Sequence, residues 1–132
     1  MPHYVLDART ATPHFPGIGR YVTSLIPPLA SALTPDEHLT VLVARDEISF
    51  EAGTGTIKTH FIDESPFSLR QQWTVPKLLK TLKADLYHSP YLLMPYRPGV
   101  PTVVTVHDII PLLFPEQSTW RARMLFSLSL RL

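Results

Sequence analysis

Apolar residues in this chain occur in short runs that polar and proline-containing stretches separate. Runs rich in valine, isoleucine and leucine, bounded by turn-forming residues, are typical of buried strands. Such runs predict five strands, over His3–Asp7, Leu39–Val43 and Ile57–Ile62, within Ala84–Pro90, and over Pro101–Val106. A loop that contains Gly53 and Gly55 is expected between the second and third strands.

Between the strands, apolar residues recur every three or four positions, as they do on one face of a helix. This spacing predicts a helix from about Ile18 to Leu33, with Tyr21 on the face that packs on the sheet. A second helix is expected from about Ser68 to Leu82, with Leu69 and Trp73 among its apolar positions.

Proline is unusually frequent, with 14 residues that mostly stand where segments should end. Three prolines fall inside the predicted helices instead. Proline lacks a backbone N–H and crowds the preceding turn, so Pro27 and Pro28 must kink the first helix or divide it. Pro76 predicts a kink in the second helix for the same reason.

Strands that alternate with helices predict an α/β fold, here a Rossmann-like, doubly wound and mostly parallel sheet with helices on both faces. No repeat or flexible linker divides the chain, so residues 1–132 are expected to form one domain. An apolar helical pattern from Trp120 to Leu132 lacks a glycine cap. It indicates either a fragment, whose exposed apolar surface could promote self-association, or a natural C-terminal helix that docks on the sheet.

Composition narrows the class of protein. Of 132 residues, 45% are hydrophobic and 17% charged, as in ordinary globular domains, and the net charge of +1 gives no reason to expect nucleic acid as a partner. The absence of cysteine excludes disulfides and thiolate metal sites and fits a reducing cytoplasm. The N-terminus has no signal-peptide pattern, and no apolar run is long enough to span a bilayer.

Two histidines follow predicted strands. His107 and Asp108 come directly after Pro101–Val106, and His88 closes the preceding strand before Pro90. Ligands of open α/β sheets bind at this end of the strands, so both imidazoles are expected at one site. They could hydrogen-bond sugar hydroxyls, hold a metal as in His-Asp phosphohydrolases, or serve only the local structure.

Two further patterns allow more than one interpretation. Gly17 and Gly19 precede or open the first helix, where free N–H groups favour phosphate, although the glycines could equally relieve a crowded turn. They do not match the dinucleotide fingerprint, because Val22 stands where a third glycine is required. Lys77, Lys80 and Lys83 form a basic rim that fits an anionic membrane, an acidic acceptor or simply a solvated helix face.

Taken in order, these motifs resemble the N-terminal half of glycosyltransferase family 4, whose members are retaining GT-B enzymes and include many hexosyl- and mannosyltransferases of polysaccharide synthesis. The resemblance covers nearly the whole chain. It rests on Asp7-Ala8-Arg9, Gly17-Ile18-Gly19-Arg20-Tyr21, Arg70-Gln71-Gln72-Trp73, Ala84–Pro90, and Pro101–Asp108 with Pro115-Glu116.

The resemblance implies a role for each candidate residue. The amides around Gly17 and Gly19 would approach the diphosphate of a nucleotide-sugar donor, and His107 would hydrogen-bond the donor sugar near the reacting carbon. The acceptor side would be lined by three residues, His88, Tyr91 and Asp108. Asp7 and Arg20 could instead form a structural ion pair beneath the glycine loop.

The resemblance also implies a division of labour. This domain would hold a sugar or lipid-linked acceptor, and a second Rossmann-like domain, not included in these residues, would hold most of the donor. The isolated chain is then expected to be inactive, to need no metal or other cofactor, and to work in the cytoplasm or at the inner face of the membrane. Two alternatives stay open, a non-catalytic binding or interaction domain and a nucleotide-dependent enzyme of another class, such as an oxidoreductase.

Overall fold

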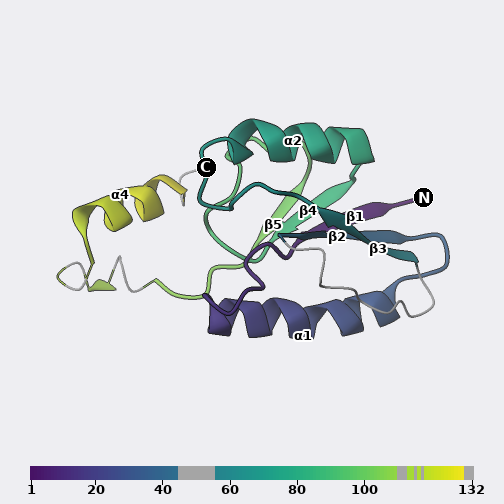
Figure 1. Ribbon diagram of the computed structural model, residues 1–132, viewed down its shortest axis with the longest axis horizontal. Coiled ribbons are helices and arrows are strands. Elements are labelled where there is room, and N and C mark those ends of the chain that lie inside the picture. The colour runs from purple at the N-terminus through teal and green to yellow at the C-terminus, as the bar shows by residue number, and fades with distance from the viewer. Residues whose placement is uncertain (45–55, 110–112, 115, 117, 130–132) are drawn as a thin grey trace.

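A five-stranded sheet, parallel throughout, forms the centre of the protein (Figure 1). The computed structural model describes residues 1–44, 56–109, 113, 114, 116 and 118–129. The strands lie in the order β3-β2-β1-β4-β5. The elements follow one another as β1 (His3–Asp7), α1 (Pro16–Ala32), β2 (His38–Val43), β3 (Thr56–Phe61), α2 (Gln71–Leu82), β4 (Leu86–Ser89), β5 (Thr102–Val104) and α4 (Trp120–Ser129).

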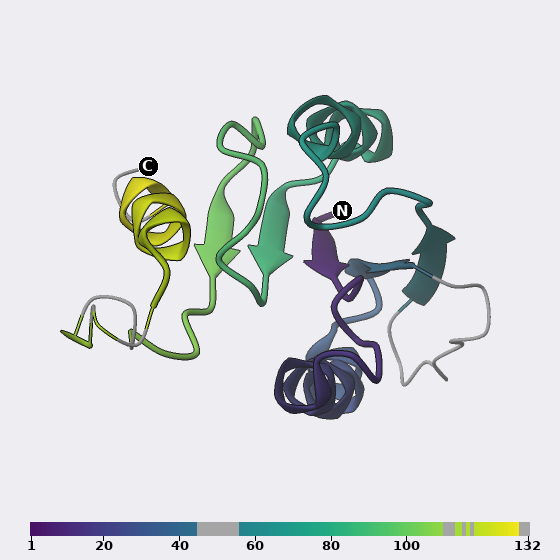
Figure 2. The same cartoon turned by 60° about the vertical axis from the view of Figure 1, so that its left-hand side comes forward.

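Helices cover both faces of the sheet, which confirms the predicted α/β, Rossmann-like fold. Figure 2 shows α1 against one face and α2 against the other. Successive residues of a strand point to opposite faces, so Leu6 of β1 packs towards Val22 and Ile26 of α1. Its neighbour Val5 packs towards Val75 and other α2 residues. The continuous apolar runs seen in the sequence are therefore explained by burial on two sides.

Helix α1 is not divided at its two prolines, although a kink or a division was expected; it runs unbroken from Pro16 to Ala32. Pro27 and Pro28 both lie on the exposed side of the helix. The carbonyl groups that lose an N–H partner, those of Thr23 and Ser24, belong to exposed residues as well, so water can satisfy them. Pro76 likewise lies inside an uninterrupted α2.

Three large side chains that the sequence placed on apolar helix faces are exposed instead. The buried residues of α1 are Gly19, Val22, Ile26 and Ala30, which leaves Tyr21 on the flank of the helix. Trp73 is 71% exposed, because it lies on the side of α2 opposite the buried residues. Leu69 is 79% exposed and precedes the helix, which begins at Gln71 after two hydrogen-bonded turns.

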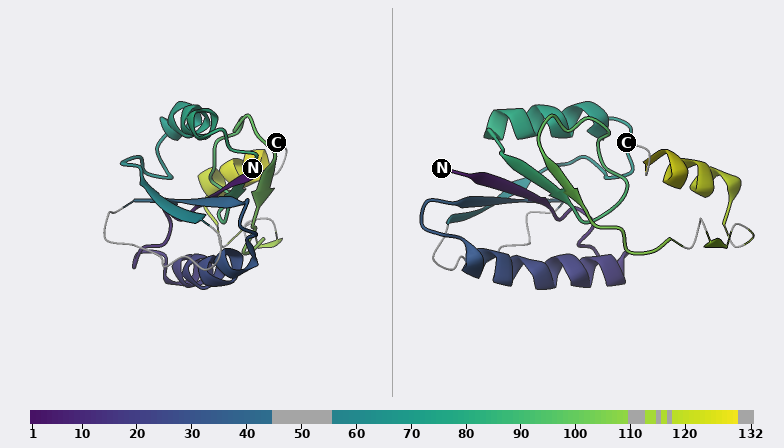
Figure 3. Two further views of the ribbon diagram at one scale, coloured as in Figure 1. Left: turned by 90° about the vertical axis from the view of Figure 1, so that its right-hand side faces the viewer. Right: turned by 180° about the vertical axis from the view of Figure 1, so that it is seen from behind.

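The last described helix, α4, lies beyond the carboxyl ends of the strands and covers neither face of the sheet (Figures 1 and 3). Trp120, Met124 and Leu128 of this helix are exposed. The expectation that this segment docks on the sheet is therefore wrong for its described part. The expected end of the helix at Leu132 and the loop with Gly53 and Gly55 lie outside the described residues. None of the described helices has the length and apolarity that crossing a bilayer requires.

Candidate functional site

The carboxyl ends of β1, β4 and β5 meet the start of α1 at one edge of the sheet (Figure 1). The chain leaves β1 towards β2 but leaves β4 towards β5, in the opposite direction. This divergence is the topological switch point at which open α/β sheets bind ligands.

A buried ion pair forms the floor of the edge. The carboxylate of Asp7, the last residue of β1, accepts hydrogen bonds from Nε of Arg9 at 2.9 Å and from Nη2 at 2.6 Å. The hydroxyl of Tyr87 on β4 donates to the same carboxylate at 2.6 Å. Arg9 also donates to the side chain of Gln71 at the start of α2, so the floor joins three elements.

Burial and charge set the protonation of this floor. Burial alone lowers the pKa of Arg9, but attraction to Asp7 and the hydrogen bonds outweigh burial and leave that pKa above its ordinary value. Burial, followed by the charge of Asp7, raises the pKa of Tyr87 well above its ordinary value. Asp7 thus pairs with Arg9, and the expected ion pair with Arg20 is wrong. Arg20 lies on the exposed side of α1.

His107 lies in the segment that follows β5 and is exposed. Its Nε2 is 2.8 Å from the carbonyl oxygen of Pro90. A carbonyl oxygen can only accept, so Nε2 carries the proton and Nδ1 of the neutral ring is an acceptor. No hydrogen bond to Nδ1 is made by the described residues. The ring of Tyr21 lies edge-on to the imidazole, with 5.0 Å between ring centroids.

Thr105 connects His88 to the same cluster. Its hydroxyl is 2.9 Å from Nε2 of His88 and 3.3 Å from the hydroxyl of Tyr21. Burial lowers the pKa of His88, which is half-buried on the α1 side of β4. The sequence prediction that both histidines belong to one edge agrees with this geometry, because Tyr21 touches His107 and Thr105, and Thr105 touches His88.

The two glycines of α1 differ in their surroundings. A Cβ atom on Gly19 would come within 3.3 Å of the carbonyl oxygen of Thr12, so Gly19 permits close packing of the preceding loop. A Cβ on Gly17 would meet nothing within 4 Å. The first helical hydrogen bond runs from the N–H of Gly19 to Phe15, and no side chain caps the helix. The N–H groups of Gly17 and Ile18 are therefore available to an anion.

Tyr91 and Asp108 lie on the outer side of this edge. Burial, and then the nearby charge of Asp108, raises the pKa of Tyr91. The ring of Tyr91 also belongs to an aromatic cluster, with centroid distances of 6.3 Å to Phe15 and 6.0 Å to Phe67. Phe15 and Phe67 are 5.3 Å apart. The three rings offer an apolar surface next to the start of α1.

Sequence reasoning missed three contributors to this edge. Arg9 was noticed only as part of a motif, Tyr21 was assigned to the core, and Thr105 was not singled out. A local signal existed for Tyr21, which lies one helical turn after Gly17. Asp7 is only two residues from Arg9, but the other two partners of Arg9, Glu64 and Gln71, are distant in sequence, and only the fold brings them together.

The assembled edge offers chemistry suited to a polyhydroxylated anion. It combines free helix N–H groups, a histidine acceptor atom, a carboxylate and aromatic rings. Across the described ranges, no three histidine, aspartate or glutamate side chains gather closely enough to hold a metal ion. No protein-family model, curated protein or solved structure matches this chain.

Proposed function

We propose that this chain is the acceptor-side domain of a retaining, nucleotide-sugar-dependent glycosyltransferase of family 4, acting in the cytoplasm on hexosyl or mannosyl transfer. The observation that supports this most is the contact between Tyr21 and His107. It brings the uncapped start of α1 beside an imidazole whose Nδ1 is free to accept a hydrogen bond. A donor with a diphosphate and a hydroxylated ring needs both features side by side.

In this proposal the residues of the edge have separate roles. The N–H groups of Gly17 and Ile18 stabilise the negative charge that grows on the leaving diphosphate. His107 accepts a hydrogen bond at Nδ1 from a hydroxyl of the donor sugar, while its Nε2–H stays on Pro90. Gly19 supports the site by letting the loop approach α1.

The transfer itself requires no protein nucleophile in this proposal. The bond between the anomeric carbon and the phosphate oxygen breaks, the acceptor hydroxyl oxygen bonds to the same face of that carbon, and the departing phosphate takes the hydroxyl proton. Tyr91 and Asp108 contact the acceptor, which is a sugar or a lipid-linked sugar. His88 acts as a positioning residue, because its ring reaches the edge through Thr105.

The proposal is tested by titrating the isotopically labelled chain with GDP-mannose, UDP-glucose and NAD while recording amide and imidazole NMR spectra. We expect a nucleotide-sugar to shift the amide signals of Gly17 and Ile18 and the ring signals of His107, without turnover. NAD should not shift them. Specific binding of NAD, or shifts by a nucleotide-sugar that are confined to residues outside this edge, would reject the assignment.

Two variants of His107 separate binding from folding. The amide of His107→Gln can still donate to Pro90, because the glutamine nitrogen mimics Nε2, but it removes the acceptor Nδ1. We expect this variant to keep the melting temperature and lose nucleotide-sugar binding. His60→Gln on the edge strand β3 is the matched control and should change neither. Equal loss of stability and binding in His107→Gln would give the histidine a structural role only.

A further inference from the structure

The outer side of α2 and the turn before it expose an unusual set of apolar side chains. Trp73 and Leu69 are the most exposed of these, and Phe67 is about half exposed. All three lie at the end of α2 that is nearest the carboxyl edge of the sheet. Isolated apolar residues on a surface are common, but a tryptophan, a leucine and a phenylalanine together mark an interaction surface.

The same side of α2 is positively charged. Trp73, Lys77 and Lys80 follow at intervals of four and three residues, so they share the face opposite Val75 and Leu79, which are buried. Residues 65–84 contain no aspartate or glutamate. Within the described part of the chain, no carboxylate lies within ion-pairing distance of Lys77 or Lys80.

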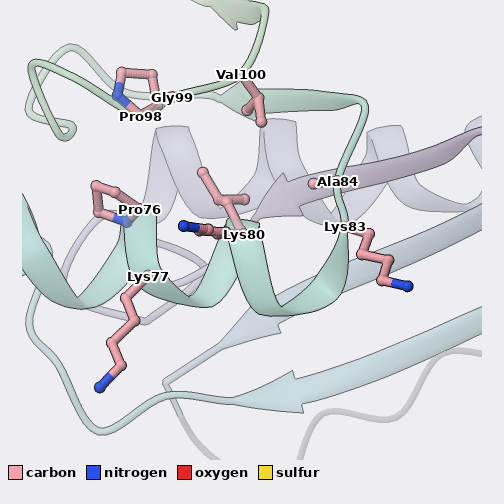
Figure 4. A pocket seen from close by; sticks show the side chains of 9 residues that line it. Pro76, Lys77, Lys80, Lys83, Ala84, Pro98, Gly99 and Val100 are labelled. Carbon is pink, nitrogen blue, oxygen red and sulfur yellow. The ribbon is translucent and has the colours of Figure 1, made fainter.

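A cavity of about 640 Å³ lies between α2 and the segment before β5 (Figure 4). Figure 4 shows that the side chains of Lys77 and Lys83 extend away from Pro98 and Val100, which line the cavity on its other side. The ammonium groups of Lys77 and Lys83 therefore do not converge on an enclosed ligand. These two face outwards, as expected for an extended anionic partner.

We propose that this face, made of Phe67, Leu69, Trp73, Lys77 and Lys80, docks on a lipid bilayer that contains anionic phospholipids. Tryptophan with leucine and phenylalanine enters the interfacial layer, and lysines bind headgroup phosphates. A second copy of the chain is a poorer partner, because a two-fold contact would bring the lysines of both copies together. Nucleic acid would use the lysines but leaves Leu69 without a role.

The docked orientation has a consequence for the neighbouring edge. Phe67 contacts both Phe15 and Tyr91, so the aromatic cluster lies directly beside the proposed membrane face. Docking through α2 would hold the aromatic cluster of the candidate site close to the bilayer surface. The membrane proposal itself does not depend on the glycosyltransferase proposal, since it concerns binding alone.

Vesicle binding tests the proposal on the whole chain. Vesicles of phosphatidylcholine are compared with vesicles that also contain phosphatidylglycerol, using co-sedimentation. Trp120→Phe leaves Trp73 as the only tryptophan, so a blue shift of its emission on binding reports insertion. We expect a blue shift and binding only with the anionic vesicles, and weaker binding as salt increases.

Substitutions test the apolar and the charged residues of this face separately. Each lysine near an anionic membrane contributes about a fivefold increase in binding, so Lys77→Gln with Lys80→Gln should reduce binding more than tenfold. Leu69→Ser with Trp73→Ser should greatly reduce co-sedimentation with the anionic vesicles. The matched controls are Arg20→Gln and Trp120→Ser, which change equally exposed side chains elsewhere and should leave binding within twofold. Circular dichroism verifies that each variant is folded.

Three results would overturn the proposal. The first is equal binding to neutral and anionic vesicles, or loss of binding in the controls as large as in the α2 variants. The second is a concentration-dependent dimer that the α2 variants dissolve, which would assign the face to a second copy. The third is binding of an oligonucleotide in preference to anionic vesicles.

Discussion

Replacing Asp7 with asparagine should cost this protein a large part of its stability. The substitution preserves the size of the side chain but removes the charge that Arg9 faces. The guanidinium of Arg9 is fully buried, with a side-chain exposure of 0%, so water cannot replace the lost partner. The asparagine amide would also direct an N–H group towards Arg9 or Tyr87, both of which need an acceptor at this position.

The structure sets the size of the effect. Asp7 accepts from two nitrogens of Arg9 and from the Tyr87 hydroxyl, all within the buried floor. Removing one partner of a buried ion pair typically costs about 3–5 kcal/mol. A domain of this kind has a total unfolding free energy of about 5–15 kcal/mol, so the variant would be marginally stable.

Thermal and urea unfolding followed by circular dichroism measure this change. We expect Asp7→Asn to lower the melting temperature by roughly 10–20 °C. Asp36→Asn, which changes an exposed aspartate in a turn, is the control and should have little effect. The double variant Asp7→Asn with Arg9→Met should lose less than the sum of the single losses. A loss below about 1 kcal/mol in Asp7→Asn would refute the account of a buried, charge-dependent floor.

Two other predictions concern α1 and β4. Gly19→Ala should lower the unfolding free energy by about 1–3 kcal/mol, because the new Cβ meets the backbone of Thr12. Gly17→Ala should raise the unfolding free energy by up to about 1 kcal/mol, since alanine favours the helix and the space is open. Urea unfolding that ranks the two variants the other way would contradict the packing argument. His88 has an ordinary pKa of 6.5 that burial lowers, so the unfolded chain binds its proton first and stability should fall as pH drops below about 6.5. His88→Gln should show a smaller fall over the same pH range, and parallel pH profiles would contradict this assignment.

The central strands β1 and β2 were predictable because they carry continuous apolar runs. His3–Asp7 is recovered residue for residue, and the predicted second strand differs from β2 only by lacking His38. The site's place at the carboxyl edge was also predictable, since parallel strands deliver their following residues to one side. For these central strands the sequence pattern alone was sufficient, because burial on two faces leaves a strong local signal.

Contacts between distant segments were not predictable in the same way. Trp73 is large and apolar, yet it is exposed. The face of α2 that packs on the sheet is occupied by smaller residues such as Val75, and Trp73 lies on the other side of the helix. Arg9 resembles any polar loop residue in the sequence, although it pairs with Asp7 of β1 and also donates to Gln71 of α2, 62 residues away. The aromatic cluster takes one ring from each of three loops, so no window of sequence contains it.

The position of β1 in the middle of the sheet has a consequence for biosynthesis. This strand precedes the other four along the chain, but one of its two neighbours, β4, is translated about 80 residues later, as the separation of 80 residues between Asp7 and Tyr87 illustrates. Pairing between such remote segments closes a long loop and slows folding. The nascent chain must therefore keep Asp7 and Arg9 without the Tyr87 hydroxyl until about 80 further residues have been made.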